Sequence, residues 1–157
     1  MRVFIMRHGE ASFHAESDPA RPLTERGVEE TSQMALRLHQ MVGDISCVLV
    51  SPYLRAQQTL ETIRRAFPLS ADVSIETVSQ LIPGGDPGWC ADYLTVLAQQ
   101  GVSEVLVVSH LPLVSYLVSE LSQGSASPMF STSSVACVTL DDKTLRGRFE
   151  WQISPGS

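Results

Sequence analysis

Residues 1–9 read Met-Arg-Val-Phe-Ile-Met-Arg-His-Gly. The unbroken apolar run from Val3 to Met6 predicts a short strand that is buried on both faces. The strand runs out into Arg7 and His8, whose side chains are polar and chemically reactive. In open α/β sheets, ligands bind beyond the carboxyl ends of the strands. These nine residues therefore predict a buried strand with a candidate site at its end.

Strand-like and helix-like stretches alternate along the rest of the chain. Further strands are predicted over residues 47–50, 73–78, 104–109, 135–140 and 147–153. Helices are predicted over residues 24–42, 51–67, 89–101 and 113–121. This alternation predicts a three-layer α/β/α fold, with helices on both faces of a mostly parallel central sheet and an antiparallel edge from the last two strands. No repeat or linker divides the sequence, so we expect one domain over residues 1–157.

Local patterns refine these elements. The helix over residues 24–42 has one apolar face, formed by Val28, Ala35, Leu38 and Val42. Ser51 is predicted to cap the next helix, because serine is a good N-cap and Pro52 suits the first turn. Residues 82–88 are dense in proline and glycine and predict a loop, which leaves no room for a helical lid.

Composition and charge exclude several classes of function. The chain has 157 residues, 43% hydrophobic and 18% charged, with a net charge of −6. Nucleic acid is not an expected partner, because a duplex-binding protein needs a basic surface. No apolar run approaches the ~20 residues of a membrane span, and the opening run is too short for a secretory signal. We expect a cytoplasmic protein without membrane contact, and a monomer, since nothing indicates an obligate dimer.

The three cysteines do not indicate a framework or a metal site. Cys47, Cys90 and Cys137 are widely spaced and form no Cys-x-x-Cys pair. They predict neither disulfides nor a zinc site. Cys47 and Cys137 lie in or beside apolar runs, so we expect them to be buried as small hydrophobic residues.

Polar residues follow three predicted strands at the end where a ligand is expected. The first strand runs into Arg7 and His8, the second into a helix with Arg55 in its first turn, and the fourth into His110. Two arginines and two histidines thus converge on one edge of the sheet. Helix N-termini after the second and fourth strands add positive dipole ends. Such a site suits a dianion.

These residue types indicate phosphoryl chemistry. A neutral imidazole, such as that of His8, is a competent nucleophile at pH 7 and forms an intermediate that water can hydrolyse. Arginine offers phosphoryl oxygens a planar fork of donors and keeps its charge. Since Arg7, Arg55 and His110 can stabilise the charge, no metal or other cofactor is expected. Gly9 is also expected at the phosphate, because a glycine lets the backbone bend tightly beside the nucleophile, where a Cβ would obstruct the phosphate.

Four segments together carry a resemblance to a known family. They are Arg-His-Gly at 7–9, Pro-Leu-Thr-Glu-Arg-Gly at 22–27, Ser-Pro-Tyr-Leu-Arg-Ala-Gln-Gln-Thr at 51–59 and Val-Ser-His at 108–110. In this order they resemble the histidine phosphatase (phosphoglycerate-mutase-like) superfamily. Within it, the short length and the segments at 81–86 and 110–114 resemble the SixA-type phosphohistidine phosphatases.

This resemblance implies a role for each matching residue. It implies that His8 is the phosphorylated nucleophile and that Arg7 and Arg55 clamp the phosphate. It implies that His110 is a further phosphate ligand. The fold it implies is the phosphoglycerate-mutase-like one in a minimal form without a helical lid. SixA-like relatives act on phosphohistidine of histidine-containing phosphotransfer (HPt) domains and similar carriers, so the implied partner is an HPt domain or a phosphocarrier protein.

Two positions depart from the wider superfamily. Many relatives carry an asparagine where this chain has His14, and a glutamate acting as general acid where this chain has Pro83. The missing acid agrees with a phosphohistidine substrate, because imidazole is a much less basic leaving group than an alkoxide. Asp86 and Glu10 remain candidate proton donors. For His14, a loop surface and the rim of the site both stay open.

Two other functions stay open from the sequence. One is a phosphomonoesterase or mutase for small metabolites, against which the missing acid and the missing lid both count. The other is an adaptor that binds phosphohistidine without turnover, which the intact His8 disfavours. An open cleft favours a phosphorylated side chain on a folded protein, because small ligands prefer enclosed pockets.

Overall fold

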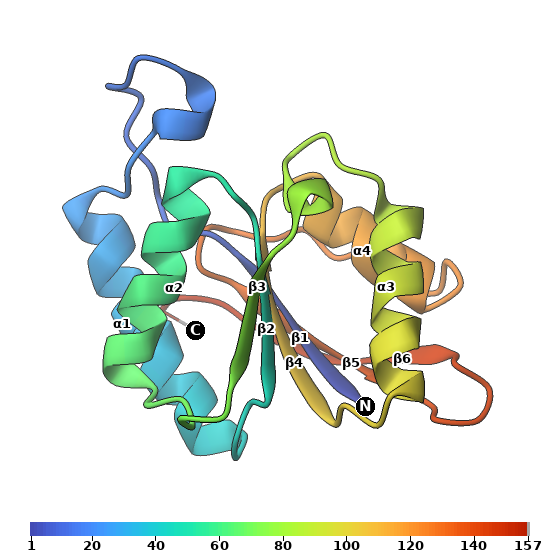
Figure 1. The fold of residues 1–157 in the computed structure, drawn as a ribbon. Coiled ribbons are helices and arrows are strands. Elements are labelled where there is room, and N and C mark those ends of the chain that lie inside the picture. The colour runs from blue at the N-terminus through green and yellow to red at the C-terminus, as the bar shows by residue number, and fades with distance from the viewer. Residues whose placement is uncertain (157) are drawn as a thin grey trace.

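In the computed structural model, which describes residues 1–156, a six-stranded sheet lies between two layers of helices (Figure 1). The strands are β1 (Arg2–Arg7), β2 (Cys47–Val50), β3 (Ser74–Thr77), β4 (Glu104–Ser109), β5 (Val135–Leu140) and β6 (Gly147–Ile153). The helices are α1 (Glu25–Met41), α2 (Leu54–Ala66), α3 (Pro87–Gln99) and α4 (Leu113–Leu121), with the short 3-10 helices η1 (Asp18–Ala20) and η2 (Ser79–Leu81). The predicted elements are confirmed, with ends shifted by a few residues.

The order of the strands brings three carboxyl ends together. The sheet runs β3-β2-β4-β1-β5-β6. The first four strands are parallel to one another, β5 is antiparallel to β1, and β6 is antiparallel to β5, which gives the predicted antiparallel edge. Strand β4 lies between β2 and β1, with Arg7 in register with Ser109 and Val50 in register with Val108. The residues that follow these three strands therefore adjoin at one edge.

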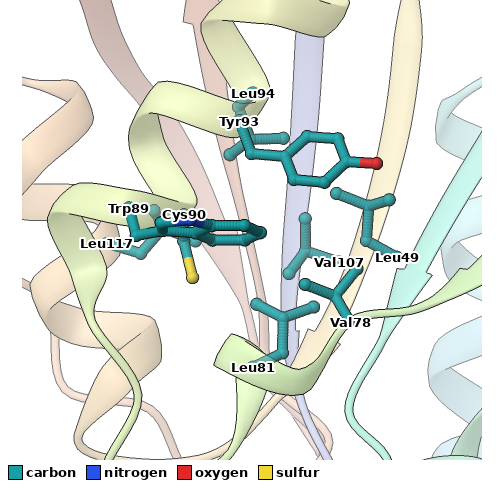
Figure 2. A pocket seen from close by; sticks show the side chains of 9 residues that line it. All are labelled: Leu49, Val78, Leu81, Trp89, Cys90, Tyr93, Leu94, Val107 and Leu117. Atoms are coloured by element: carbon teal, nitrogen blue, oxygen red, sulfur yellow. The ribbon is translucent and has the colours of Figure 1, made fainter.

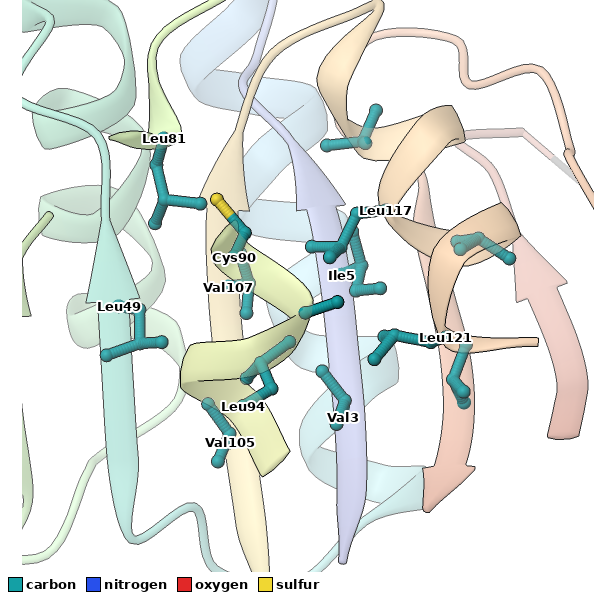
Figure 3. Packing of buried hydrophobic residues seen from close by; sticks show 14 of the residues in the cluster. Val3, Ile5, Leu49, Leu81, Cys90, Leu94, Val105, Val107, Leu117 and Leu121 are labelled. Carbon is teal, nitrogen blue, oxygen red and sulfur yellow. The ribbon is translucent and has the colours of Figure 1, made fainter. Parts of the chain in front are cut away.

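The inner strands are buried on both faces, which explains their continuous apolar runs. In β1, Val3 and Ile5 pack with α3 and α4 (Figure 3), whereas Phe4 and Met6 pack with α1 and α2. All four side chains are at most 1% exposed. Replacing Phe4 by Ala is expected to lower the free energy of unfolding by about 3–5 kcal/mol, because the substitution leaves a cavity in a well-packed core. This rigid double core holds the strand ends in place.

The predicted apolar face of α1 is wrong at one position. Val28 is 39% exposed, and the buried face includes Gly27, Thr31, Met34, Ala35 and Leu38 instead. The cause is the close packing of Gly27, where an added Cβ would collide with the backbone carbonyl oxygen of Glu10. Since neighbouring residues lie about 100° apart around a helix, this contact turns Val28 outward.

All three cysteines are buried and unpaired, and burial of Cys47 and Cys137 was expected. Burial raises the pKa of Cys90 and of Cys137 to about 11, so both are neutral thiols at pH 7. Within residues 1–156, no helix combines the length and the hydrophobicity that crossing a membrane requires.

Candidate active site

The carboxyl ends of β1, β2 and β4 border an open pocket of about 450 Å³. The two arginines and two histidines singled out in the sequence all line it: Arg7, His8, Arg55 and His110. Their segments are far apart in the chain, so the sheet order is what brings them together. The loop between β1 and α1 completes the lining with Phe13, Asp18 and Arg21, which the sequence patterns did not single out.

His8 is held in the protonation state of a nucleophile. Its ring is 7% exposed, with Nδ1 2.7 Å from the carbonyl oxygen of Gly9 and Nε2 3.3 Å from Nε of Arg55. Because a carbonyl only accepts, Nδ1 carries the ring proton and Nε2 keeps its lone pair. Burial lowers the pKa of His8 to about 4; the bond to Gly9 opposes this shift and the charges of Arg55 and Arg7 add to it. The ring is therefore neutral at pH 7.

Gly9 allows the backbone after His8 to pack closely against two helices. An added Cβ would lie 2.6 Å from Oγ1 of Thr31 and 2.9 Å from the carbonyl oxygen of Gly27, both in α1. The backbone N–H of Gly9 also donates to Oγ1 of Thr59 in α2, at 3.0 Å. The glycine thus allows the turn after His8 to pack against α1 and α2.

Arg55 is the second residue of α2, within the first turn as predicted, and is only 4% exposed. Besides its contact to His8, its Nη1 donates to the carbonyl oxygen of Asp18 at 2.7 Å and its Nη2 donates to Oδ2 of Asp18 at 3.2 Å. A buried cation close to the positive end of a helix dipole needs an anionic partner. In this structure Asp18 is that partner.

Ser51 orients His110 and does not cap α2, so that prediction is wrong. The residue at the N-cap of α2 is Tyr53, without a capping side chain. The hydroxyl of Ser51 accepts from the backbone N–H of Tyr53 at 3.2 Å and lies 2.7 Å from Nε2 of His110. When the hydroxyl donates to Nε2, the proton of neutral His110 is on Nδ1. Burial, followed by the charges of His8 and Arg55, lowers the pKa of His110 to about 2.

Two buried nitrogens in this pocket have no hydrogen-bond partner. Among the buried side-chain nitrogens and oxygens of residues 1–156, only Nε of Arg7 and Nδ1 of His110 are unpaired. One end of the Arg7 guanidinium is anchored, since Nη1 donates to the carbonyl oxygen of Phe130 at 2.9 Å. An unpaired buried N–H group costs about 1–3 kcal/mol. Both nitrogens belong to residues that line the pocket.

The other candidate residues lie in three different settings. Glu10 lines the pocket, and its Oε1 accepts from the hydroxyl of Thr24 at 2.9 Å. His14 is exposed and is not part of the lining. Asp86 lies outside the lining too, and its carboxylate caps α3 by accepting from the backbone N–H groups of Gly88 and Trp89. Pro83, which stands where many relatives carry a glutamate as general acid, borders the pocket.

A second hollow lies between η2, α3 and the sheet, and it is a packing gap. Figure 2 shows the rings of Trp89 and Tyr93 beside apolar side chains that include Leu81 and Val107. Its volume of about 10 Å³ is close to that of a single water probe. In the part of the chain that the structure describes, no three His, Cys, Asp or Glu side chains gather as a metal site would require.

Fold and site together define an α/β protein whose anion pocket surrounds a neutral, buried histidine. Residues 3–81 match the family model of the histidine phosphatase superfamily (branch 1). The chain belongs to the histidine phosphatase superfamily and is an enzyme, a hydrolase.

Similar proteins confirm the resemblance and the fold. The phosphohistidine phosphatase SixA of Escherichia coli (strain K12) is 50% identical over 155 residues, which are 99% of this chain and 94% of that protein. The phosphohistidine phosphatase SixA homolog of Haemophilus influenzae is 42% identical over 126 residues, 77% of each chain. The solved structure of the protein histidine phosphatase SixA complexed with tungstate matches with a TM-score of 0.94 and 50% identity, covering 99% of this chain and 97% of that one.

Proposed function

We propose that this enzyme removes phosphate from phosphohistidine on an HPt domain or a phosphocarrier protein, through a phosphoryl intermediate on His8. The observation that carries the proposal is the pair of unpaired buried nitrogens, Nε of Arg7 and Nδ1 of His110, in one pocket with the neutral ring of His8. They fit the oxygens of a phosphoryl group. The similarity to SixA phosphohistidine phosphatases supports the nature of the substrate.

The first step transfers the phosphoryl group to His8. The lone pair on Nε2 attacks phosphorus, the N–P bond of the substrate breaks, and its electron pair returns to the substrate's ring nitrogen. The N–H on Nδ1 keeps its bond to the carbonyl oxygen of Gly9, which stabilises the positive charge that develops on the ring. Arg7, Arg55 and His110 stabilise the three equatorial oxygens.

The second step regenerates the enzyme. A water molecule attacks the phosphorus, the bond to Nε2 of His8 breaks, and the electron pair returns to Nε2. Inorganic phosphate then leaves. The cationic groups that bind the oxygens act in both steps, because the charge is distributed over the same three oxygens.

The shape of the pocket supports a substrate attached to a protein. The pocket is open, and residues 78–86 between β3 and α3 contain only the short helix η2. At its rim Phe13 is 85% exposed, an unusual position for a large apolar ring unless a partner covers it. A phosphorylated side chain can enter such a site while its protein rests on the rim.

The proposal includes a cytoplasmic location and a single chain as the active unit. Three unpaired, buried cysteines fit a reducing compartment. The pocket is complete within one chain, so catalysis needs no second copy.

The proposal is tested with a histidine-containing protein phosphorylated by potassium phosphoramidate, compared with 3-phosphoglycerate. Wild-type enzyme should release phosphate from the phosphoprotein faster, and His8→Ala should abolish release, whereas His39→Ala at an exposed position should not. Replacing Arg7 or Arg55 by Ala should cost roughly 3–4 kcal/mol of transition-state stabilisation. Faster turnover of 3-phosphoglycerate identifies a metabolite phosphatase instead. Phosphoprotein binding without release by the wild type identifies an adaptor, and retained activity in His8→Ala excludes His8 as nucleophile.

A further inference from the structure

A carboxylate lies inside the pocket that otherwise collects positive charge. Asp18 begins η1, in the segment that rises above the edge of the sheet in Figure 1 (blue). Its Oδ2 accepts from Nη2 of Arg55 and its Oδ1 accepts from Nη1 of Arg21, each at 3.2 Å. The Asp18 side chain is 53% exposed, whereas His8 is 7% exposed. Asp18 therefore lies toward the mouth of the pocket, with His8 at its base.

Asp18 leaves Arg55 able to bind a phosphoryl group. A guanidinium has five N–H donors, and in Arg55 three of them are directed at His8 and Asp18. Partial burial acts to raise the pKa of Asp18, but hydrogen bonds from Arg21 and Arg55 outweigh it and the pKa is lowered. The carboxylate is thus charged at pH 7 and opposes any second negative charge that enters.

The loop that carries Asp18 is fixed, so this charge has a defined place. Nε of Arg21 donates to the carbonyl oxygen of Ser12 at 2.9 Å, and its guanidinium lies over the ring of Phe13, 4.1 Å from the centroid. Arg21 thereby ties both ends of the loop together, and Arg55 ties Asp18 to the sheet edge. A preorganised charge discriminates between ligands better than a mobile one.

Phosphohistidine is the phosphoryl compound that gains from a negative charge at this place. Its ring has a second nitrogen, which carries a proton and a positive charge when the N–P bond is ready to break. A phosphate ester has no such cation. A hydrogen bond between an ionised donor and an ionised acceptor is roughly twice as strong as a neutral one.

We infer that Asp18 selects phosphohistidine, by accepting a hydrogen bond from the protonated ring of the substrate while repelling phosphate esters. This inference rests on the proposed function and names the group that sets its substrate class. When His8 attacks, the N–P electron pair returns to the substrate ring, and the proton stays on the far nitrogen beside Asp18. The leaving group departs as neutral imidazole, so no separate proton donor is required.

The test uses Asp18→Asn, which keeps the size of the side chain and removes its charge. Two substrates are compared: the phosphoramidate-treated protein described above, and p-nitrophenyl phosphate, whose leaving group is weakly basic and carries no cation. For the variant, kcat/KM on the phosphoprotein should fall about tenfold to a hundredfold, while kcat/KM on p-nitrophenyl phosphate should be unchanged or rise. Inhibition by inorganic phosphate should become tighter by about threefold, because a repulsive charge is removed.

The matched control is Glu61→Gln, which removes a carboxylate from an exposed pair with Arg65 on α2. It should leave both substrates and phosphate inhibition unchanged. A variant that misfolds cannot bind phosphate more tightly, so that readout separates selectivity from damage. Equal loss on both substrates means that Asp18 acts only by placing Arg55, and unchanged kinetics mean that it has no role; either result overturns the inference. A wild type inactive on the phosphoprotein but active on the ester refutes the proposed function itself.

Discussion

Acidification should weaken the fold through the two histidines of the pocket. Burial is the main reason that the pKa of His8 falls to about 4 and that of His110 to about 2, from an ordinary value of 6.5. The unfolded chain exposes both rings, so below about pH 6.5 the unfolded state binds more protons than the folded one. The stability that belongs to the neutral rings is complete above the unfolded pKa and is lost as the pH falls toward the folded values.

The magnitude follows from the same values. Between pH 7 and pH 5, an unfolded histidine goes from about one quarter protonated to almost fully protonated, while the folded rings stay mostly neutral. Linkage then gives a loss of about 2 kcal/mol per histidine over this interval. Because pH 5 lies above both folded values, the loss depends almost wholly on the unfolded chain.

Urea unfolding at pH 7 and pH 5 measures this loss in the wild type, in His8→Asn and in His39→Asn. Carboxylates also titrate over this interval, but their contribution cancels when the variants are compared. The change in unfolding free energy should be smaller by about 2 kcal/mol in His8→Asn than in the wild type. His39→Asn, at an exposed position of α1, is the matched control. If His8→Asn loses as much stability on acidification as the wild type does, His8 is not buried as a neutral ring.

Two further predictions concern single contacts. Gly85→Ala should lower the free energy of unfolding by about 2 kcal/mol or more, because its Cβ would collide with the carbonyl oxygen of Gln80. Gly84→Ala, where a Cβ meets no atom within 4 Å, should stay within about 0.5 kcal/mol, and equal urea midpoints for the two variants would contradict the packing of this loop. Ser51→Ala should lower kcat on the phosphoprotein about tenfold, because His110 loses the partner that keeps its proton on Nδ1. Steady-state kinetics check this against Ser46→Ala, an exposed hydroxyl, and equal rates for the two variants would exclude the role of Ser51.

Continuous apolar runs are the part of the fold that the sequence predicts best. Strands β1, β2 and β4 are buried on both faces, so hydrophobicity alone marks them. Helix starts are less certain, because a side chain that suits a cap can be recruited by a distant residue. Ser51 bonds to His110, 59 positions away, and α2 begins only at Leu54. The outward turn of Val28 likewise comes from a contact of its neighbour with a different segment.

The residues brought together in the pocket were predictable to the extent that they follow strands. Parallel strands end at one edge, so Arg7, His8 and His110 could be placed without coordinates. Asp18 could not, because residues 10–24 have no regular period and its contact with Arg55 spans 37 positions. The sequence also could not show which of the two candidate proton donors lies at the pocket. In the structure Glu10 borders the pocket, whereas Asp86 caps α3.

The features of the pocket that lower the stability of the fold are the ones that the proposed function uses. Two unpaired buried nitrogens lower the stability of the fold, but under the proposed function they are groups that bind the phosphoryl oxygens. A site that binds a phosphoryl group also binds the product phosphate, although the net charge of the whole chain is −6. The negative charge of Asp18, which pairs with Arg55 at 3.2 Å, opposes that affinity. Tight binding of the transition state is thereby compatible with release of the product, because the cation that Asp18 favours belongs to the substrate alone.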